Sequence, residues 1–223
     1  MAGHALGDVV YTIEQLPNVV RNIYCIGRNY RDHAVELGNA VPESPMVFGK
    51  PTHALTAAAG DLMLPAGRQN IHHEVEIVLV MGDAHRPGEP FANRVSGVAL
   101  GLDLTDRDAQ NRLKKAGQPW EFAKGFRHAA VMTDVYAVND WDAMLHTPFR
   151  LIRNGQTVQE GVARDMLFHW QTLLDFIAEH FGLGAGDVVY TGTPAGVGPL
   201  EDGDELVLQF ADATLGRCRV RRA

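Results

Sequence analysis

Short apolar runs bounded by Gly, Pro, Asn or Asp recur along the chain, and this pattern predicts a protein built mainly of strands. The runs cover 9–13, 23–26, 46–48, 75–81, 98–104, 188–191, 206–210 and 218–220. Between 149 and 160, the pair Asn154-Gly155 separates two extended halves. This pair favours a tight hairpin because both central residues must take positive φ. A second hairpin is expected to turn at Asp212-Ala213.

Helical periodicity is confined to a few segments. Apolar residues recur at three- and four-residue steps through 166–181, which predicts an amphipathic helix with Asp165 near its start and Gly182 just past its end. Residues 106–116 are expected to form a more polar helix, acidic at its start and basic at its end, as the helix dipole favours. A third, short helix is expected over 30–37.

Composition and charge exclude several classes of protein. With 46% hydrophobic and 21% charged residues, the 223-residue chain is globular, and a formal charge of -7 without a basic cluster beyond its C-terminal arginines argues against nucleic-acid binding. No apolar run approaches the roughly 18 to 20 residues of a membrane helix, and the start lacks the order of a signal peptide. We therefore expect a cytoplasmic protein without a membrane partner.

Domain organisation is simple, because the chain contains no internal repeat and no linker. Residues 1–20 are expected to form a short N-terminal segment, and 21–223 one domain. Cys25 and Cys218 lack metal-type or C-x-x-C spacing, so we expect two small buried side chains and no disulfide framework.

The segment 72–80 carries Glu74 and Glu76 and then becomes apolar. Taken as a single strand with a period of two, it places both glutamates on the same face as Val78 and Val80, so both carboxylates are expected in a buried strand. They would lie roughly 6.5 to 7 Å apart along it. Two like charges there are unfavourable unless a cation bridges them or one keeps its proton.

A third carboxylate, Asp103, follows the buried run 98–102. Three converging oxygen ligands without cysteine suit a hard cation, Mg²⁺ or Mn²⁺, better than Zn²⁺. The adjacent His72 and His73 offer a rival zinc site, although no H-E-x-x-H spacing exists. From these residues alone, a purely structural ion-pair network is a third interpretation.

A candidate general base follows the strand predicted over 23–26. If 30–37 is helical, His33 and Glu36 face the same side, and the carboxylate can hold the imidazole in one tautomer and raise its basicity. Such a pair can activate water. The alternative is an exposed helical pair of no consequence.

Two further segments are ambiguous by themselves. Lys124 lies in the aromatic-rich stretch 120–126, where a lysine is either a buried cation or snorkels to the surface. Residues 191–199 follow a buried strand and resemble an anion-holding loop of backbone amides and hydroxyls, although they lack the motif of a phosphate-binding P-loop. An ordinary Gly/Pro turn is the alternative interpretation.

Taken together, these segments resemble the fumarylacetoacetate hydrolase family, in particular its short acylpyruvate-type members. The resemblance runs from about Ile23 to Phe210 and rests on the order and spacing of several motifs. These are Gly27-Arg28-Asn29-Tyr30 with His33 and Glu36, His72-His73-Glu74-Val75-Glu76, Leu102-Asp103-Leu104-Thr105 with Arg107 and Gln110, Lys114-Lys115-Ala116-Gly117-Gln118-Pro119-Trp120 with Lys124, and Gly186-Asp187-Val188-Val189 before Thr191-Gly192-Thr193-Pro194.

The resemblance implies an α+β protein with a mixed β-roll and a few flanking helices, usually a homodimer, whose catalytic domain would be 21–223. It also implies functional roles for ten residues. Glu74, Glu76 and Asp103 would hold Mg²⁺ or Mn²⁺, His33 with Glu36 would activate water, Lys124 and Gln110 would contact the substrate, Thr193 would help to hold its carboxylate, and Arg28 and Arg107 would lie near the site. One departure is the run 126–131, Phe-Arg-His-Ala-Ala-Val, where relatives continue with a Phe-x-x-Ser-Cys-Pro type sequence.

The activity expected from this resemblance is cleavage of a carbon–carbon bond in a small 2-oxo acid, with the metal and Lys124 stabilising an enolate. Hydrolysis of an acylpyruvate, with fumarylpyruvate as a candidate substrate, is the first hypothesis. Oxaloacetate decarboxylation or keto–enol tautomerisation on the same scaffold is the alternative. A non-catalytic metal- or ligand-binding module is the competing interpretation from a different class.

Overall fold

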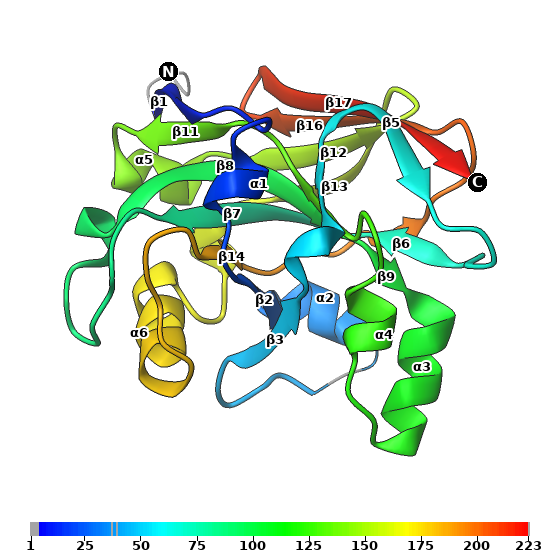
Figure 1. Cartoon of the computed structure of the whole chain (residues 1–223), viewed down its shortest axis with the longest axis horizontal. Coiled ribbons are helices and arrows are strands. Elements are labelled where there is room, and N and C mark those ends of the chain that lie inside the picture. Colours follow the sequence, from blue (N-terminus) through cyan, green and yellow to red (C-terminus); the bar gives the residue numbers. More distant parts are fainter. Residues whose placement is uncertain (1–4, 37, 39, 223) are drawn as a thin grey trace.

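The computed structural model describes residues 5–36, 38 and 40–222. These residues form three sheets with a few short helices, which is the α+β architecture expected from the sequence (Figure 1). The nine-stranded sheet runs in the order β1 (Leu6–Tyr11), β11 (Val135–Val138), β8 (Val95–Asp103), β7 (Val75–Met81), β14 (Val188–Tyr190), β2 (Ile23–Gly27) and β3 (Met46–Lys50), with β10 (Ala130–Met132) on β8 and β4 (Leu55–Ala57) on β10.

Two smaller sheets complete the strands. The five-stranded sheet contains, in spatial order, β13 (Gln156–Gly161), β12 (Phe149–Arg153), β16 (Glu205–Phe210), β17 (Ala213–Arg222) and β5 (Ala59–Leu64). The three-stranded sheet contains β15 (Gly198–Pro199), β6 (Ile71–His73) and β9 (Thr105–Asp106). Strands β12, β16 and β17 contact β7 and β8, so the five-stranded sheet covers one face of the nine-stranded sheet and the main apolar core lies between them.

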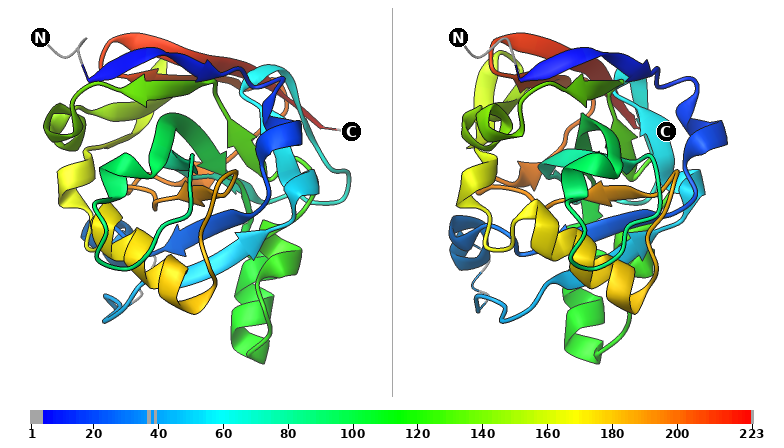
Figure 2. Two further views of the ribbon diagram at one scale, coloured as in Figure 1. Left: turned by 60° about the vertical axis from the view of Figure 1, so that its left-hand side comes forward. Right: turned by 90° about the vertical axis from the view of Figure 1, so that its left-hand side faces the viewer.

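The helices lie at the margins of the sheets, and α3 projects from the body in all three views (Figures 1 and 2). They are α1 (Leu16–Val19), α2 (Arg31–Glu36), α3 (Arg107–Ala116), α4 (Glu121–Lys124), α5 (Trp141–His146) and α6 (Trp170–His180). Short 3₁₀ helices cover Thr52–Ala54, Phe91–Asn93 and Ala163–Asp165. None of the helices in the described part of the chain is long and apolar enough to cross a membrane.

Strand β7 is buried along its whole length, as its two apolar faces predict. It pairs antiparallel with β8 on one side and with β14 on the other. The single strand expected over 72–80 is, however, interrupted at Glu74, because β6 pairs in the three-stranded sheet and β7 in the nine-stranded sheet. Glu74 therefore lies at the point where the chain changes sheets.

The hairpin at Asn154-Gly155 is confirmed, since both residues have positive φ, 51° and 80°. The second hairpin turns one residue earlier than expected. Phe210 pairs with Ala213, and Ala211 takes the positive φ of 50°. The buried Phe210 side chain keeps the strand intact up to that position, so the turn is confined to 211–212.

Helix α3 begins where the sequence predicts it, because the Asp106 carboxylate accepts a hydrogen bond from the Ala109 amide at 3.0 Å. The expectation for α6 was wrong at its start, since α6 begins at Trp170 and not near Asp165. The reason is a tertiary contact that periodicity cannot show. Backbone and side chain of Asn29 accept hydrogen bonds from the amides of 167 and 168, which holds that segment outside the helix.

Three other expectations concern the chain ends, the short helix and the cysteines. Within the expected N-terminal segment, β1 pairs with β11 and extends the nine-stranded sheet. Helix α2 covers Arg31–Glu36, and Leu37 at the end of the expected helix lies outside the described residues. Cys25 and Cys218 are both buried and free, as predicted.

Gly101 in β8 generates a test of the packing beside Asp103. A Cβ atom at this position would lie 2.6 Å from Tyr190 Cε1 and 2.7 Å from the carbonyl oxygen of Val131. We expect Gly101→Ala to lower the free energy of unfolding by about 1 to 3 kcal/mol, the usual cost of overpacking. Urea denaturation measures this, with Gly184→Ala as the matched control because the nearest atom there is 4.0 Å away. Equal midpoints for both variants would contradict the packing argument.

Candidate metal centre and active site

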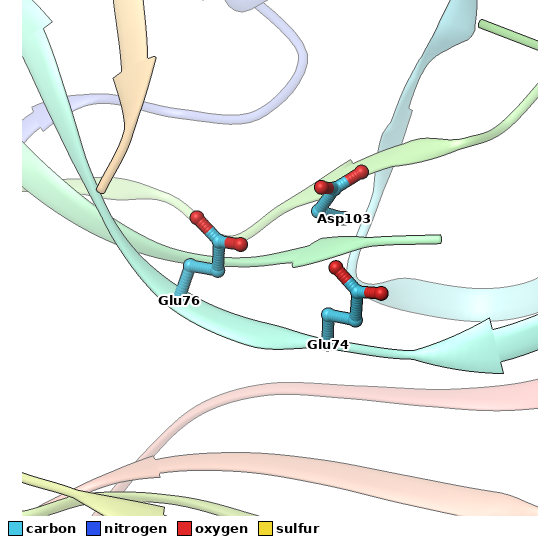
Figure 3. A group of neighbouring side chains, drawn as sticks. All are labelled: Glu74, Glu76 and Asp103. Atoms are coloured by element: carbon cyan, nitrogen blue, oxygen red, sulfur yellow. The ribbon is translucent and has the colours of Figure 1, made fainter. Parts of the chain in front are cut away.

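Three buried carboxylates converge on one face of the β7–β8 pair (Figure 3). Glu74 lies at the change of sheets, Glu76 in β7, and Asp103 at the end of β8. One oxygen from each carboxylate lies within 4.8 Å of the others. The expectation that these three residues cluster in a buried strand region is met, and Asp103 ends a core strand as its neighbours predict.

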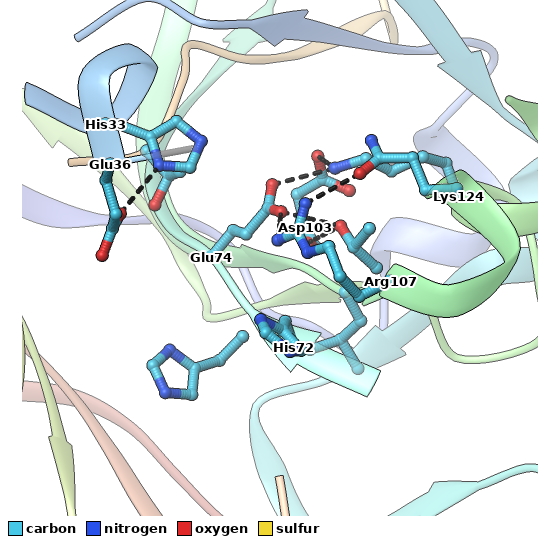
Figure 4. Close-up of polar contacts among 12 residues, drawn as sticks. His33, Glu36, His72, Glu74, Asp103, Arg107 and Lys124 are labelled. Atoms are coloured by element: carbon cyan, nitrogen blue, oxygen red, sulfur yellow. Dashed lines mark hydrogen bonds and ion pairs between the residues drawn. The ribbon is translucent and has the colours of Figure 1, made fainter. Parts of the chain in front are cut away.

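Three buried cations, Lys50, Arg107 and Lys124, surround two of these carboxylates, and Figure 4 shows Arg107 and Lys124 beside Glu74. Lys124 Nζ lies 2.8 Å from Glu74 Oε2 and 2.6 Å from Asp103 Oδ2. Arg107 Nη2 lies 2.6 Å from Glu74 Oε1, and Lys50 Nζ lies 2.7 Å from Asp103 Oδ1. Lys124 is therefore a buried cation, 3% exposed, and not a snorkelling surface lysine.

These contacts set the charge states of the pairs. Burial disfavours the ionised carboxyl, but Lys124 and Arg107 outweigh it and hold the pKa of Glu74 well below its usual value. Burial likewise disfavours the ammonium, yet Asp103 and Glu74 hold the pKa of Lys124 above its usual value. Both groups are therefore charged at neutral pH.

Glu76 has a different environment. Its Oε2 accepts a hydrogen bond from the Gly192 amide at 2.7 Å, and no lysine or arginine in the described part of the chain forms an ion pair with it. Burial, Asp103 and Glu74 raise the pKa of Glu76 well above its usual value. An added cation beside Glu76 would remove this electrostatic cost, so the donor set fits a hard divalent ion held by three carboxylate oxygens.

The histidines of the rival zinc hypothesis are engaged elsewhere. His73 Nδ1 lies 2.9 Å from Gln159 Oε1, and His72 Nε2 lies 2.8 Å from Asn70 Oδ1. Within the described ranges, the group of side chains close enough to hold a metal consists of carboxylates only. This all-carboxylate ligand set suits a hard divalent cation better than Zn²⁺.

The His33–Glu36 pair lies beside this cluster on α2. His33 Nδ1 is 3.3 Å from Glu36 Oε2, and the other oxygen, Oε1, accepts a hydrogen bond from the Gly196 amide at 3.0 Å. His33 is 5% exposed, whereas the Glu36 side chain is 32% exposed, so the pair joins a buried imidazole to a carboxylate near the surface. Burial lowers the pKa of His33 below 6.5, against the opposing effects of Glu74 and Glu36, and the imidazole is therefore neutral at pH 7.

One pocket is lined by all of the predicted site residues except Glu36. Glu36 contacts His33, which does line the pocket. The pocket is lined by Ile26, Gly27, Arg28, His33, Phe48, Glu74, Glu76, Asp103, Arg107, Gln110, Lys114, Trp120, Lys124 and Thr193. Within it, Arg107 Nη1 donates to Gln110 Oε1 at 2.8 Å, which orients the amide.

The 191–199 segment does hold anions, but those it holds are the protein's own carboxylates. Gly192 donates to Glu76 and Gly196 donates to Glu36. The Thr193 hydroxyl donates to the Val75 carbonyl oxygen at 2.9 Å and accepts from Gln159 Nε2. The loop therefore connects the metal centre with the His33–Glu36 pair. The Thr193 hydroxyl forms its hydrogen bonds with other groups of the protein.

The run 126–131, where the sequence departs from its relatives, lies behind the pocket. Ala130 pairs with Asp103, and the Ala129 carbonyl oxygen accepts from the Leu104 amide at 2.9 Å. None of the residues 126–131, all of them described, lines the pocket. The segment supports Asp103 through its backbone, so its side chains can change without altering the walls of the pocket.

Sequence reasoning did not single out Lys50, and it named Lys114 only within a family motif, without a role in the site. Lys50 ends a short apolar strand and precedes a proline. A buried lysine is unusual at such a position, but the sequence there does not specifically predict a site residue. Lys114 follows Arg107 and Gln110 at helical spacing, so it could have been found from the face that those two residues define.

The family model for the C-terminal region of fumarylacetoacetate (FAA) hydrolase matches residues 22–221. The chain belongs to the fumarylacetoacetate hydrolase family. This confirms the resemblance and the fold inferred from the sequence motifs.

Several relatives cover most of the chain. Oxaloacetate tautomerase YcgM of Escherichia coli is 40% identical over 86% of this chain and 89% of its own length, and human mitochondrial oxaloacetate tautomerase FAHD1 is 36% identical over 83% and 85%. The crystal structure of fumarylpyruvate hydrolase from Pseudomonas aeruginosa in complex with Mn²⁺ and pyruvate is 30% identical, covers 92% of this chain and 91% of its own, and has a TM-score of 0.83.

Metal binding can be tested by thermal unfolding. A ligand that binds only the folded state at 100 times its Kd stabilises by about 2.7 kcal/mol, which corresponds to a rise in Tm of roughly 5 to 10 °C for a chain of this size. We expect such a rise with Mg²⁺ or Mn²⁺, and a much smaller one in Glu76→Gln, which loses one ligand charge. Glu179→Gln, an exposed carboxylate on α6, is the control. An unchanged Tm at millimolar metal would contradict the site.

Proposed function

We propose that this protein is a metal-dependent enzyme that interconverts the keto and enol forms of oxaloacetate. The proposal is carried by one observation, a buried three-carboxylate cation site that shares a pocket with a neutral, carboxylate-held histidine. The names of the two tautomerases at 40% and 36% identity agree with it. Among the hypotheses formed from the sequence, the alternative is therefore better supported than acylpyruvate hydrolysis.

Tautomerisation requires a proton to leave C3 of the 2-oxo acid and another to reach the C2 oxygen. A bound Mg²⁺ or Mn²⁺ at Glu74, Glu76 and Asp103 would supply Lewis-acid stabilisation of negative charge on that oxygen. The protein's own groups must bind the substrate, keep it oriented and move the C3 proton.

His33 is suited to carry the C3 proton. Glu36 accepts from Nδ1, so Nδ1 bears the hydrogen and Nε2 has the free lone pair. Because burial keeps the imidazole neutral at pH 7, Nε2 can accept a proton from carbon and return it. This chemistry uses the same pair that the sequence assigned to water activation, but it consumes no water.

Lys124 and Arg107 provide fixed positive charge on the opposite side. Both are buried and held by Glu74, so they need no rearrangement when negative charge develops on the substrate. Gln110, oriented by Arg107, adds an amide to the pocket wall. We assign these three residues to substrate orientation and stabilisation of the enolate.

Acylpyruvate hydrolysis is the second candidate, because fumarylpyruvate hydrolase from Pseudomonas aeruginosa has a similar fold at 30% identity. In that reaction, His33 and Glu36 would activate a water molecule that attacks the distal carbonyl. Decarboxylation of oxaloacetate and hydrolysis of an acylpyruvate both produce the enolate of pyruvate, but decarboxylation needs neither the water nor the removal of a C3 proton. The same pocket accommodates all three schemes, so the products formed from each substrate distinguish them.

Other expectations from the sequence remain predictions of this proposal. They are a small 2-oxo acid as the partner, no nucleic-acid partner, a homodimer and a cytoplasmic location. The human tautomerase is named as mitochondrial, so direct localisation of this protein tests the cytoplasmic prediction.

The direct test is to supply three substrates to the purified protein with Mg²⁺. We expect the rate of ketonisation of enol-oxaloacetate to exceed the non-enzymatic rate by far. The loss of enol absorbance measures this rate. Pyruvate release from acetylpyruvate, fumarylpyruvate and oxaloacetate, measured in parallel, reports hydrolysis and decarboxylation. Faster pyruvate release from an acylpyruvate than ketonisation of oxaloacetate would reverse the assignment.

The pH profile tests His33 as the base. Activity should be present above the pKa of His33 and lost as pH falls through it, and because burial places this pKa below 6.5, the acid limb of kcat/KM should lie below 6.5. Glu36 raises the pKa of His33, so Glu36→Gln should shift the limb to lower pH. Asp32→Asn removes an exposed charge from the same helix and should leave the limb in place. A limb that Glu36→Gln leaves unmoved would exclude His33.

A further inference from the structure

Two cations in the pocket stand outside the ion-pair network of the metal centre. Arg28 and Lys114 both line the pocket, and neither has a carboxylate within ion-pair distance among the described residues. Lys50, Lys124 and Arg107, in contrast, are each paired with Glu74 or Asp103. Lys50, Lys124 and Arg107, the inner cations, are thus paired with carboxylates of the protein. Arg28 and Lys114, the outer cations, line the pocket without such a carboxylate among the described residues.

The backbone holds Arg28 in a conformation that a non-glycine residue rarely adopts. Its φ is 59°, in the left-handed region. The buried Asn29 next to it donates to the carbonyl oxygens of Phe168 at 3.0 Å and Thr191 at 2.8 Å, and accepts from the Phe168 amide. Such strain persists when surrounding contacts impose it, and here the contacts keep Arg28 at the pocket wall.

Lys114 is placed by aromatic rings and not by an acid. Its Nζ lies 5.3 Å from the centroid of the Trp120 ring, which packs edge-on against Phe48 at 5.9 Å. Phe48 in turn lies 4.9 Å from Lys124 Nζ, so the two rings connect the inner cation with the outer one. A cation–π contact uses the charge of the ammonium but leaves its N–H donors available.

An anion would reduce the electrostatic repulsion between the positive charges of Arg28 and Lys114. Burial, Arg28 and Arg107 lower the pKa of Lys114, which shows that like charges crowd it. A carboxylate between Arg28 and Lys114 would pair with both and satisfy their free donors, as charge-assisted hydrogen bonds do.

We propose that Arg28 and Lys114 form a subsite for the second carboxylate of the substrate, and that this subsite makes the enzyme selective for dicarboxylic 2-oxo acids. The inference rests on the proposed function, because it assumes that the 2-oxo acid end of the substrate lies at the metal centre. A monocarboxylate such as pyruvate would leave both cations unpaired. Lys114 is therefore a specificity-determining residue that acts on the charge at the distal end of the substrate.

Calorimetric binding to the Mg²⁺-loaded protein tests the subsite with two ligands that cannot tautomerise. Oxalate carries the chelating end alone, and 3,3-difluorooxaloacetate adds the second carboxylate but has no C3 proton to lose. We expect Lys114→Met to weaken binding of difluorooxaloacetate by about 10- to 100-fold, the scale of one hydrogen bond to a charged group, and to leave oxalate nearly unchanged. Lys114→Arg, which keeps the charge, should retain much of the preference.

The matched control is Lys115→Met, which removes the same charge from the exposed neighbouring position on α3. It should bind both ligands as the wild type does. Equal weakening of both ligands in Lys114→Met, or an equal effect of Lys115→Met, would overturn the subsite in favour of a general electrostatic effect.

The outcomes separate this inference from the proposed function. If Lys114→Met lowers the affinity for difluorooxaloacetate relative to the affinity for oxalate, the subsite stands even if oxaloacetate is not tautomerised. If oxaloacetate is tautomerised with the same KM by the wild type and Lys114→Met, the function stands and the subsite fails.

Discussion

The structure depends on the burial of three carboxylates within a few ångströms of one another, where β7 begins and β8 ends in its largest sheet. Removing the partner of a buried charge costs about 3 to 5 kcal/mol, so such a cluster persists only if cations are brought to it. Lys50 and Lys124 meet Asp103, while Lys124 and Arg107 meet Glu74. The pairing leaves Glu76 as the carboxylate that a divalent cation would balance.

This requirement explains why so many separate elements end at one pocket. Lys50 comes from the edge strand β3, and Arg107 and Lys124 come from α3 and α4, which pack on a small apolar cluster of their own. Arg68 fastens these two helices to the body. Its guanidinium pairs with Asp106 at 2.8 Å and lies 4.4 Å from the centroid of the Phe122 ring. A displacement of either helix would therefore separate the carboxylates from their cations.

The same principle links the metal centre to the proton-transfer pair. Backbone amides at Gly192 and Gly196 bind Glu76 and Glu36, so one loop sets the position of a metal ligand and of the group that orients His33. Both glycines have positive φ, and a Cβ at Gly196 would lie 2.3 Å from the Val158 carbonyl oxygen. The loop needs glycine there because its backbone passes so close to β13.

The amino-acid sequence by itself determined the local features of this protein. Apolar runs predicted the buried β7 and β8 with their carboxylates, the Asn-Gly pair predicted the hairpin, and an acidic start with a basic end predicted α3, because each depends on neighbours along the chain. The motifs in their order also identified the family. Only the tertiary structure decided that Lys50 pairs with Asp103, that Glu74 lies between two sheets and that Asn29 delays the start of α6. Those contacts join residues far apart in the chain, and their free energy arises only when folding removes the charged and polar groups from water.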